Sequence, residues 1–242
     1  MKKTLCLLLS ILMLLPLLYS CGDKENSATD FEYEENEDGG ITITNYIGTD
    51  TDVVIPSTIE GKNVTILGMY SFSRNKSLES IDIPDTVHTI SGGAFLLCSS
   101  LHTVKLPKNL RDLPPGTFES CSLLKNITLP EQLESIGARA FAECTALEEI
   151  TIPGKSLSDS SRELFAGATS LKKVVITGGC ESVANSAFAA CTSLTAIYFE
   201  GDAPTEFCQP EWFPDKECTI YYHEGAEGFT SPEWNGYPTK TW

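Results

Sequence analysis

The sequence is poor in the residues and motifs on which most catalytic and nucleic-acid-binding sites depend. It has three histidines, His88, His102 and His223, which fall in different phases of the chain, and its nine cysteines include no CxxC pair. Neither a zinc site nor a histidine-based catalytic site is therefore predicted. No GxSxG elbow, P-loop or GxGxxG phosphate loop occurs. We expect a protein that is not an enzyme, with no catalytic residues, no metal and no cofactor.

Positive charge is also scarce. The chain has 17 Lys and Arg against 33 Asp and Glu, a formal net charge of −16. Binding to nucleic-acid backbones or to an anionic lipid surface depends on Lys and Arg, so both are disfavoured, whereas a basic partner suits this balance. Acidic pairs occur at Glu148-Glu149 and at Asp50 and Asp52. They lack EF-hand spacing, so a solvated surface is the default interpretation and a calcium site is the alternative.

The N-terminus has the features of an export signal. Lys2 and Lys3 precede an apolar run, residues 4–18, which is followed by Tyr19-Ser20-Cys21. A basic flank, a short apolar core and a small residue before the cleavage point are typical of a secretory signal. The Cys at this position resembles the lipobox of a bacterial lipoprotein. The resemblance implies that residues 1–20 are removed, that Cys21 is lipidated and that the exported chain is anchored to a membrane, with the cell surface as the expected location. An uncleaved membrane anchor is the alternative, although the run is short for a spanning helix.

Between this signal and the rest of the chain lies a short polar segment. Residues 21–30 are acidic and contain no periodic apolar residue, which predicts a flexible tether. Residues 31–52 contain two alternating runs around a Gly-rich turn, FEYE and ITIT, which predict a β-hairpin that caps the N-terminal end of a repeat array.

Residues 53–218 form this repeat array, with a period of 23 residues. The unit LESIDIPDTVHTISGGAFLLCSS, residues 78–100, recurs with the same apolar positions at 101–123 and 124–146. Its first six positions alternate as a β-strand, and Pro ends the strand because Pro cannot donate to a ladder. The Ala-Phe-x-x-Cys part is expected to form a helical turn on another side. This period predicts a repeat solenoid with one parallel sheet face. The repeats begin at Leu78, Leu101, Leu124, Leu147, Leu171 and Leu194.

Two residue types recur at a fixed phase and predict two ladders inside the solenoid. The first is Phe, at 72, 95, 118, 141, 165 and 188, and the second is Cys, at 98, 121, 144 and 191. Adjacent strands are about 4.8 Å apart, within disulfide range, but in-register side chains point in parallel, so buried free thiols are expected. For Cys208 and Cys218, a disulfide in an oxidising compartment is the alternative to two thiols.

The C-terminal segment, residues 219–242, predicts a cap over the last repeat. It begins with a strand, TIYY, and ends in the aromatic, Pro-rich FTSPEWNGYPTKTW. The aromatic residues near this end allow two interpretations, packing within the cap or stacking on a sugar. They are Trp212, Trp234, Tyr237 and Trp242.

Two repeats depart from the pattern. The unit at residues 147–170 has one extra residue and carries Ser160 and Ala168 where Ile and Cys are expected. The next unit has Thr177 in place of Pro, followed by Gly178-Gly179. Such a break either widens a groove for a ligand or is sequence drift with a surface bulge near residues 156–161.

The repeat unit resembles the BspA-like leucine-rich repeat, through its Ile-Pro and Ala-Phe-x-x-Cys signatures. It lacks the Asn ladder of the standard leucine-rich repeat, since Val87, Leu110 and Leu133 stand at those positions. The resemblance covers about residues 31–242. It implies a surface or secreted interaction protein of a kind often viewed as an adhesin.

Strand positions that point away from the core are the candidate binding face, and an ordinary solvated face is the alternative. We expect a monomeric, non-catalytic cell-surface adhesion lipoprotein that binds a protein or glycan on a host or neighbouring cell. A ligand-capture or scaffold lipoprotein of a nutrient-uptake system is the alternative function. The candidate residues are Ser80, Asp82, Thr103, Lys105, Asn126, Thr128, Glu149, Thr151, Lys173, Val175, Ala196 and Tyr198.

Overall fold

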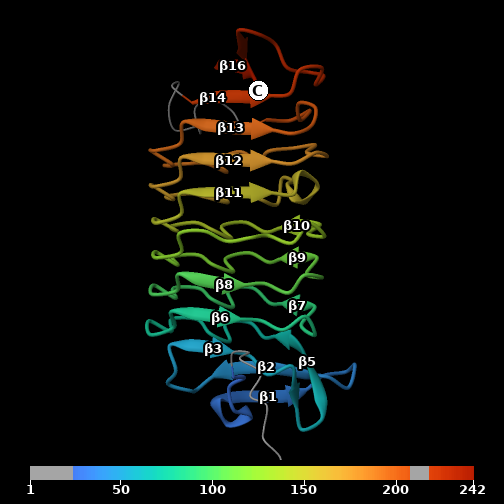
Figure 1. Cartoon of the computed structure of the whole chain (residues 1–242), viewed down its shortest axis with the longest axis vertical. Helices are drawn as coiled ribbons and strands as arrows, with labels where there is room; N and C mark the ends of the chain where they lie inside the picture. The colour runs from blue at the N-terminus through green and yellow to red at the C-terminus, as the bar shows by residue number, and fades with distance from the viewer. Residues whose placement is uncertain (1–23, 208–217) are drawn as a thin grey trace, which may run out of the picture.

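The computed structural model describes residues 24–207 and 218–242, which form an elongated solenoid of stacked coils (Figure 1). The signal segment, Cys21, Cys208 and Trp212 lie outside the described residues, so the lipidation stays a prediction. Cys218 is a buried free thiol, which does not support the alternative of a disulfide to Cys208. The elements are η1 (Ala28–Asp30), β1 (Phe31–Glu35), β2 (Ile41–Tyr46), β3 (Asp52–Val54), β4 (Thr58–Ile59), β5 (Lys62–Leu67), β6 (Ser80–Asp82), β7 (Thr89–Ile90), β8 (Thr103–Lys105), β9 (Asp112–Leu113), β10 (Ser135–Ile136), β11 (Glu149–Ile152), η2 (Gly154–Ser156), β12 (Lys173–Ile176), β13 (Ala196–Phe199), β14 (Thr219–Tyr222), β15 (Glu233–Trp234) and β16 (Tyr237–Thr241).

The predicted strand face runs along one side of the solenoid. β3, β6 and β8 pair in parallel, and β11, β12, β13, β14 and β16 form a second parallel series, with β15 antiparallel to β16. Neighbouring strands are in register one repeat apart, so Ile81 lies opposite Val104 and Ile150 opposite Val174. β14 confirms the strand predicted at the start of the C-terminal segment. β16 extends the ladder further, into the region predicted as a cap.

A second row of short strands, which the repeat pattern did not reveal, forms the next side. β2, β5 and β7 pair in parallel, and so do β9 and β10. This row exists because Ile90, Leu113 and Ile136 turn into the core while the residue before each stays exposed or half-buried. The solenoid therefore has parallel pairing on two sides of each coil rather than on one.

The Ala-Phe-x-x-Cys part forms turns, so the predicted helical turn is wrong. Phe95 and Leu97 donate their N–H groups to Thr117 and Glu119 of the next coil, at 3.0 and 2.8 Å, and Leu96 between them donates to Gly93 at 2.9 Å. The residue two positions after each Phe has a positive φ, which ends any helix there. These residues are Arg74, Leu97, Ser120, Glu143, Gly167 and Ala190, with φ between 57° and 76°.

The Phe ladder fills the core as predicted. The six rings are at most 2% exposed, and successive ring centroids lie 5.3 to 5.7 Å apart in stacked geometry. Tyr46 continues the stack at its N-terminal end, 5.4 Å from Phe72, and Phe31 packs on both rings. The predicted hairpin of β1 and β2 is confirmed, and its aromatic side chains cover the first rung.

The predicted flexible tether does not extend as far as residue 30. Asn26 pairs with the edge of β3: its N–H donates to Val54 O and its Oδ1 accepts from Val54 N–H, both at 2.8 Å. Glu25 accepts from Ser57 N–H at 3.1 Å. Ser27 caps η1 in a capping box with Asp30. Polar side chains attach this segment to the first coil, which an analysis of apolar periodicity does not detect.

The C-terminal end is closed by aromatic packing. Trp234 and Tyr237 are buried, and the Trp234 ring lies 4.9 Å from Phe229 and 6.2 Å from Phe199. Packing within the cap is therefore the correct interpretation for these two residues, and sugar stacking is wrong for them. Of the residues that the structure describes, none belongs to a helix that is long and apolar enough to cross a membrane.

The extra residue of the unit at 147–170 is absorbed in a local bulge. η2 follows β11 after Pro153, and Ser156 and Ser161 are buried. Their hydroxyls donate to Pro153 O at 2.6 Å and to Ile136 O at 2.7 Å. β11 and β12 stay regular through this unit. The structure thus favours the surface bulge over a groove opened by the insertion.

Candidate binding face

The outward direction of the candidate binding face is confirmed by the burial pattern. Ile81, Ile150, Val174 and Ile197 are at most 3% exposed. The candidate residues that flank them are all exposed or half-buried. Asn126 and Thr128 also point outward, but they do not lie on a strand.

The N-terminal part of the face holds polar pairs between neighbouring strands. Ser80 donates its hydroxyl hydrogen bond to Asp52, and Lys105 Nζ lies 2.6 Å from Asp82 Oδ2. These groups already have partners one repeat away. A ligand that binds here must compete with those contacts.

The C-terminal part of the face is aromatic. The Tyr198 ring stacks on Tyr221 with centroids 4.5 Å apart, and Lys173 Nζ lies 5.1 Å from the Tyr198 centroid. Trp242, 49% exposed, meets the Tyr198 ring edge to face at 5.1 Å and stacks on His223 at 4.4 Å. Tyr221 was missing from the predicted face, although its place in the TIYY strand would have identified it.

Between β8 and β11 the face is interrupted (Figure 1). Residues 125–129, which occupy the strand position of their repeat, form no strand, and the sheet is divided there into its three-stranded and larger parts. A cavity of about 850 Å³ opens at this place. Its lining includes the candidate residues Asn126, Thr128, Glu149, Thr151, Lys173 and Val175. The sequence of this repeat, KNITLPEQL, matches the unit and gave no indication of the interruption.

The other sides of the solenoid continue without interruption past this place. The rings of Phe118 and Phe141 stay stacked at 5.7 Å, and Phe118 N–H donates to Ala140 O at 2.9 Å. β9 and β10 pair across the same two coils. The opening is therefore confined to the strand face.

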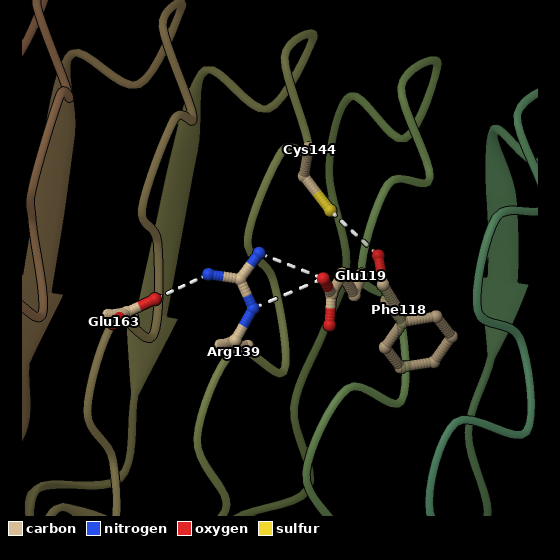
Figure 2. A network of polar contacts seen from close by, with 5 residues as sticks. All are labelled: Phe118, Glu119, Arg139, Cys144 and Glu163. Carbon is tan, nitrogen blue, oxygen red and sulfur yellow. Dashed lines mark hydrogen bonds and ion pairs between the residues drawn. The ribbon is translucent and has the colours of Figure 1, made fainter.

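Arg139 ties three coils together on the turn side. Figure 2 shows its guanidinium between Glu119 and Glu163, which come from the coils before and after. Nη2 and Nε donate to Glu119 Oε1 at 2.8 and 3.1 Å, and Nη1 donates to Glu163. The hydrogen bonds that Arg139 donates to Glu119, and then those to Glu163, raise the pKa of Arg139 above its usual value. This cluster links the coil of residues 124–146 to the coils before and after it.

The cysteine ladder consists of buried free thiols, as predicted. Each Sγ donates to the carbonyl of a Phe in the preceding coil, as Cys144 does to Phe118 O at 3.1 Å (Figure 2). Cys98, Cys121 and Cys191 make the same contact with Phe72, Phe95 and Phe165. Burial raises the pKa of Cys98, Cys144 and Cys191 to about 12, which keeps these thiols protonated and unreactive.

Exposed acidic and histidine side chains lie near oppositely charged neighbours. Glu148 bridges Lys125 and Lys172 at 3.1 and 3.2 Å, and hydrogen bonds from these lysines lower its pKa. The solvated-surface interpretation therefore fits this acidic pair. His102 lies 3.9 Å from Glu79, on an exposed surface. Within residues 24–207 and 218–242, no group of three or more His, Cys, Asp or Glu side chains is placed to hold a metal ion.

Comparison with known proteins agrees with this architecture. The model of the BspA type leucine rich repeat region matches six copies, in two overlapping stretches, residues 51–166 and 112–206. A leucine-rich repeat protein of T. pallidum is 27% identical over 76% of this chain and 86% of that chain, with a TM-score of 0.66.

A second solved structure is a leucine rich cell surface protein of Faecalibacterium prausnitzii. It is 26% identical over 85% of this chain and 56% of that chain, with a TM-score of 0.71. A leucine-rich repeat protein of Bacteroides ovatus shares the fold at 21% identity over 83% of this chain and 71% of that chain, with a TM-score of 0.54. No curated protein matches the sequence.

Proposed function

The chain belongs to the BspA-type leucine-rich repeat family, and from this premise we propose that it is a non-catalytic, cell-surface binding lipoprotein. It is exported, anchored through lipid on Cys21, and presents its strand face to a protein or glycan of a host or neighbouring cell. Three observations support the proposal: the signal ending in Ser20-Cys21, a similar protein described as a cell surface protein, and the scaffold character of a repeat solenoid.

The observation that carries the proposal is the strand face itself. It combines outward-pointing polar and aromatic side chains with a cavity, on a core of continuously stacked Phe rings. Solenoids bind partners through such extended faces. The recurring apolar positions of this array supply the scaffold, and the outward positions differ from repeat to repeat.

A binding screen of the full chain, purified in detergent, against matrix proteins and glycans at several salt concentrations tests the proposal. Any hit should weaken in a triple variant of the face, Lys105→Ala, Lys173→Ala and Tyr198→Ala. The matched control replaces the same residue types away from the strand row, Lys76→Ala, Lys155→Ala and Tyr70→Ala. Equal loss in both variants, or no hit at any salt concentration, contradicts the proposal.

Lipid anchoring is tested separately. Cys21→Ser should release the chain from the membrane fraction and abolish incorporation of labelled fatty acid, since Cys21 is the acceptor. Cys6→Ser, within the same N-terminal segment, is the control and should leave both unchanged. A Cys21→Ser chain that still sediments with the membrane supports the uncleaved anchor instead.

A second candidate function is ligand capture for an uptake system. The cavity of about 850 Å³ favours it, because ligand sites of proteins commonly enclose about 300–1,000 Å³. Titration with oligosaccharides and short peptides distinguishes the two functions. A small ligand that binds in the cavity with no macromolecular partner supports capture.

A further inference from the structure

At the interruption of the strand face, backbone groups of β11 have no hydrogen-bond partner among the residues that the structure describes. Lys173 and Thr177 donate to Glu148 O and Ile152 O, so the even-numbered residues of β11 face β12. By the alternation of a parallel ladder, Glu149 and Thr151 direct their N–H and C=O groups to the opposite side, toward residues 125–129. In the described chain, the one backbone hydrogen bond across this side is from Glu148 N–H to Lys125 O, at 3.2 Å.

Unpaired groups on a strand edge are a template for another strand. The edge of β11 differs from the ends of the solenoid, because hairpin and cap cover those ends whereas this edge opens into the cavity. The lining of the cavity includes three apolar residues, Ile127, Leu129 and Ile150, beside its polar ones. An extended segment with one apolar face therefore finds backbone partners and some apolar lining.

The charges around the cavity select the occupant. Glu131 and Glu149 line it, and neither side chain forms an ion pair or hydrogen bond with any described residue. Glu148, one residue from Glu149, is by contrast already bridged by two lysines. The unpaired carboxylates, within a chain of formal net charge −16, favour a basic ligand.

We propose that the cavity binds an extended, basic polypeptide segment as an added strand on the free edge of β11. The side chains of the segment alternate, so that apolar ones pack on Ile127 and Ile150 while Lys or Arg meet Glu131 and Glu149. This inference rests on the proposed binding function and names its partner as a polypeptide rather than a glycan. Addition of a strand to an open edge is an established mode of peptide recognition.

Hydrogen exchange of the full chain without ligand tests whether the backbone N–H groups on the open edge of β11 are unpaired. The amides of Glu149 and Thr151 should exchange at least about tenfold faster than those of Val174 and Ile197, which lie on strands paired on both sides. Slow exchange at both Glu149 and Thr151 means that the ladder is closed, and it overturns the proposal.

Binding is then measured with a defined probe, the fluorescent peptide Val-Lys-Val-Lys-Val-Lys. It should bind and protect the Glu149 and Thr151 amides. The control peptide is N-methylated at alternate residues, which removes backbone donors and keeps the charge. It should bind about tenfold or more weakly, because the backbone hydrogen bonds to β11 are lost. Equal affinity of the two peptides means that they bind by electrostatic attraction alone, which overturns the proposal. Failure of both peptides to bind overturns it as well.

Variants locate the site. Thr151→Pro removes an N–H that faces the cavity and should abolish binding, whereas Thr151→Val keeps the N–H and should bind normally. If Thr151→Pro does not fold, Glu149→Lys replaces it and should weaken binding of the basic peptide, with exposed Glu181→Lys as the control. Normal binding by whichever of Thr151→Pro and Glu149→Lys folds overturns the proposal.

Failure of this inference is distinguishable from failure of the proposed function. If a macromolecular partner is lost in the triple face variant but retained by Thr151→Pro and Glu149→Lys, the binding function stands and the added strand is wrong. If the peptide pairs with β11 as described and the screen finds no macromolecular partner, the proposed surface function fails instead.

Discussion

The interruption between β8 and β11 predicts that the solenoid is weakest at the coil of residues 124–146. We test this with Phe141→Ala, which removes a ring of that coil. Phe141 is fully buried and its centroid lies 5.7 Å from each neighbouring ring. Loss of a buried Phe costs about 3–5 kcal/mol, because transfer of the ring, about 1.5–3 kcal/mol, is added to the cavity that remains.

The matched control is Phe165→Ala. Phe165 has the same burial and the same 5.7 Å spacing to both neighbours, but its coil contributes β11, which pairs with β12, whereas the coil of Phe141 contributes no strand to the strand face. Both variants should lose a similar free energy of unfolding. In a solenoid, however, coils are held by nearest-neighbour interfaces alone. Phe141→Ala should therefore separate the two parts of the array, whereas Phe165→Ala should unfold as a unit.

Urea denaturation followed by circular dichroism and by hydrogen exchange measures the difference. For Phe141→Ala we expect two transitions, or one with a reduced m-value, because each part exposes less surface than the whole. For Phe165→Ala we expect a single transition with an unchanged m-value and a lower midpoint. A single transition with the same m-value in both variants refutes the idea that the interruption weakens coupling between coils.

Three further predictions concern the ladders and the Arg139 cluster. Cys144→Ala should lower the free energy of unfolding by about 1–2 kcal/mol, because the hydrogen bond to Phe118 O is lost. Ala168→Cys offers a thiol to Phe141 O and should raise the urea midpoint. A lower midpoint in Ala168→Cys contradicts this account. Burial raises the pKa of Cys98, Cys144 and Cys191 to about 12, so their stabilisation is complete below the unfolded thiol pKa of about 8.5 and is lost as pH rises toward 12. Ionisation of each thiol then lowers the free energy of unfolding by up to about 1.4 kcal/mol per pH unit. In urea titrations from pH 8 to 11, the free energy of unfolding of the triple Cys→Ala variant should therefore depend less on pH than that of the unmodified chain. Arg139→Gln should lower the free energy of unfolding by about 1 kcal/mol, because the half-buried guanidinium of Arg139 binds two carboxylates. The control, Arg111→Gln, removes one exposed pair with Glu134 and should change the urea midpoint little. Equal effects of the two variants contradict a special role for Arg139.

Period and alternation were sufficient to predict the core. The Phe and Cys ladders follow from residue phase, because an in-register solenoid places residues one period apart in contact. The outward direction of Ser80 or Glu149 follows from the two-residue period of a strand. These features depend on local sequence alone, so a single chain is enough to find them.

Other features depend on more than local pattern. The turns at Leu97 and Ser120 adopt positive φ without Gly, so composition gave no indication of them. Asn26 joins the fold through polar bonds to Val54. The opening at residues 125–129 depends on the sum of contacts around two whole coils, because the local sequence matches the other repeats. The candidate face was therefore predicted as a row of residues, but its cavity was not.

The thiol ladder also bears on the order of events when the chain is made. In the folded protein, each ladder Cys is enclosed and bonded to a Phe carbonyl, so oxidants have no access to it. In the unfolded chain the same thiols are exposed to solvent and able to form disulfides with one another. For a chain that enters an oxidising compartment, coil formation and air oxidation are competing reactions. Rapid stacking of neighbouring coils then protects the product as well as stabilising it, and slow-folding variants should accumulate as scrambled, disulfide-linked species.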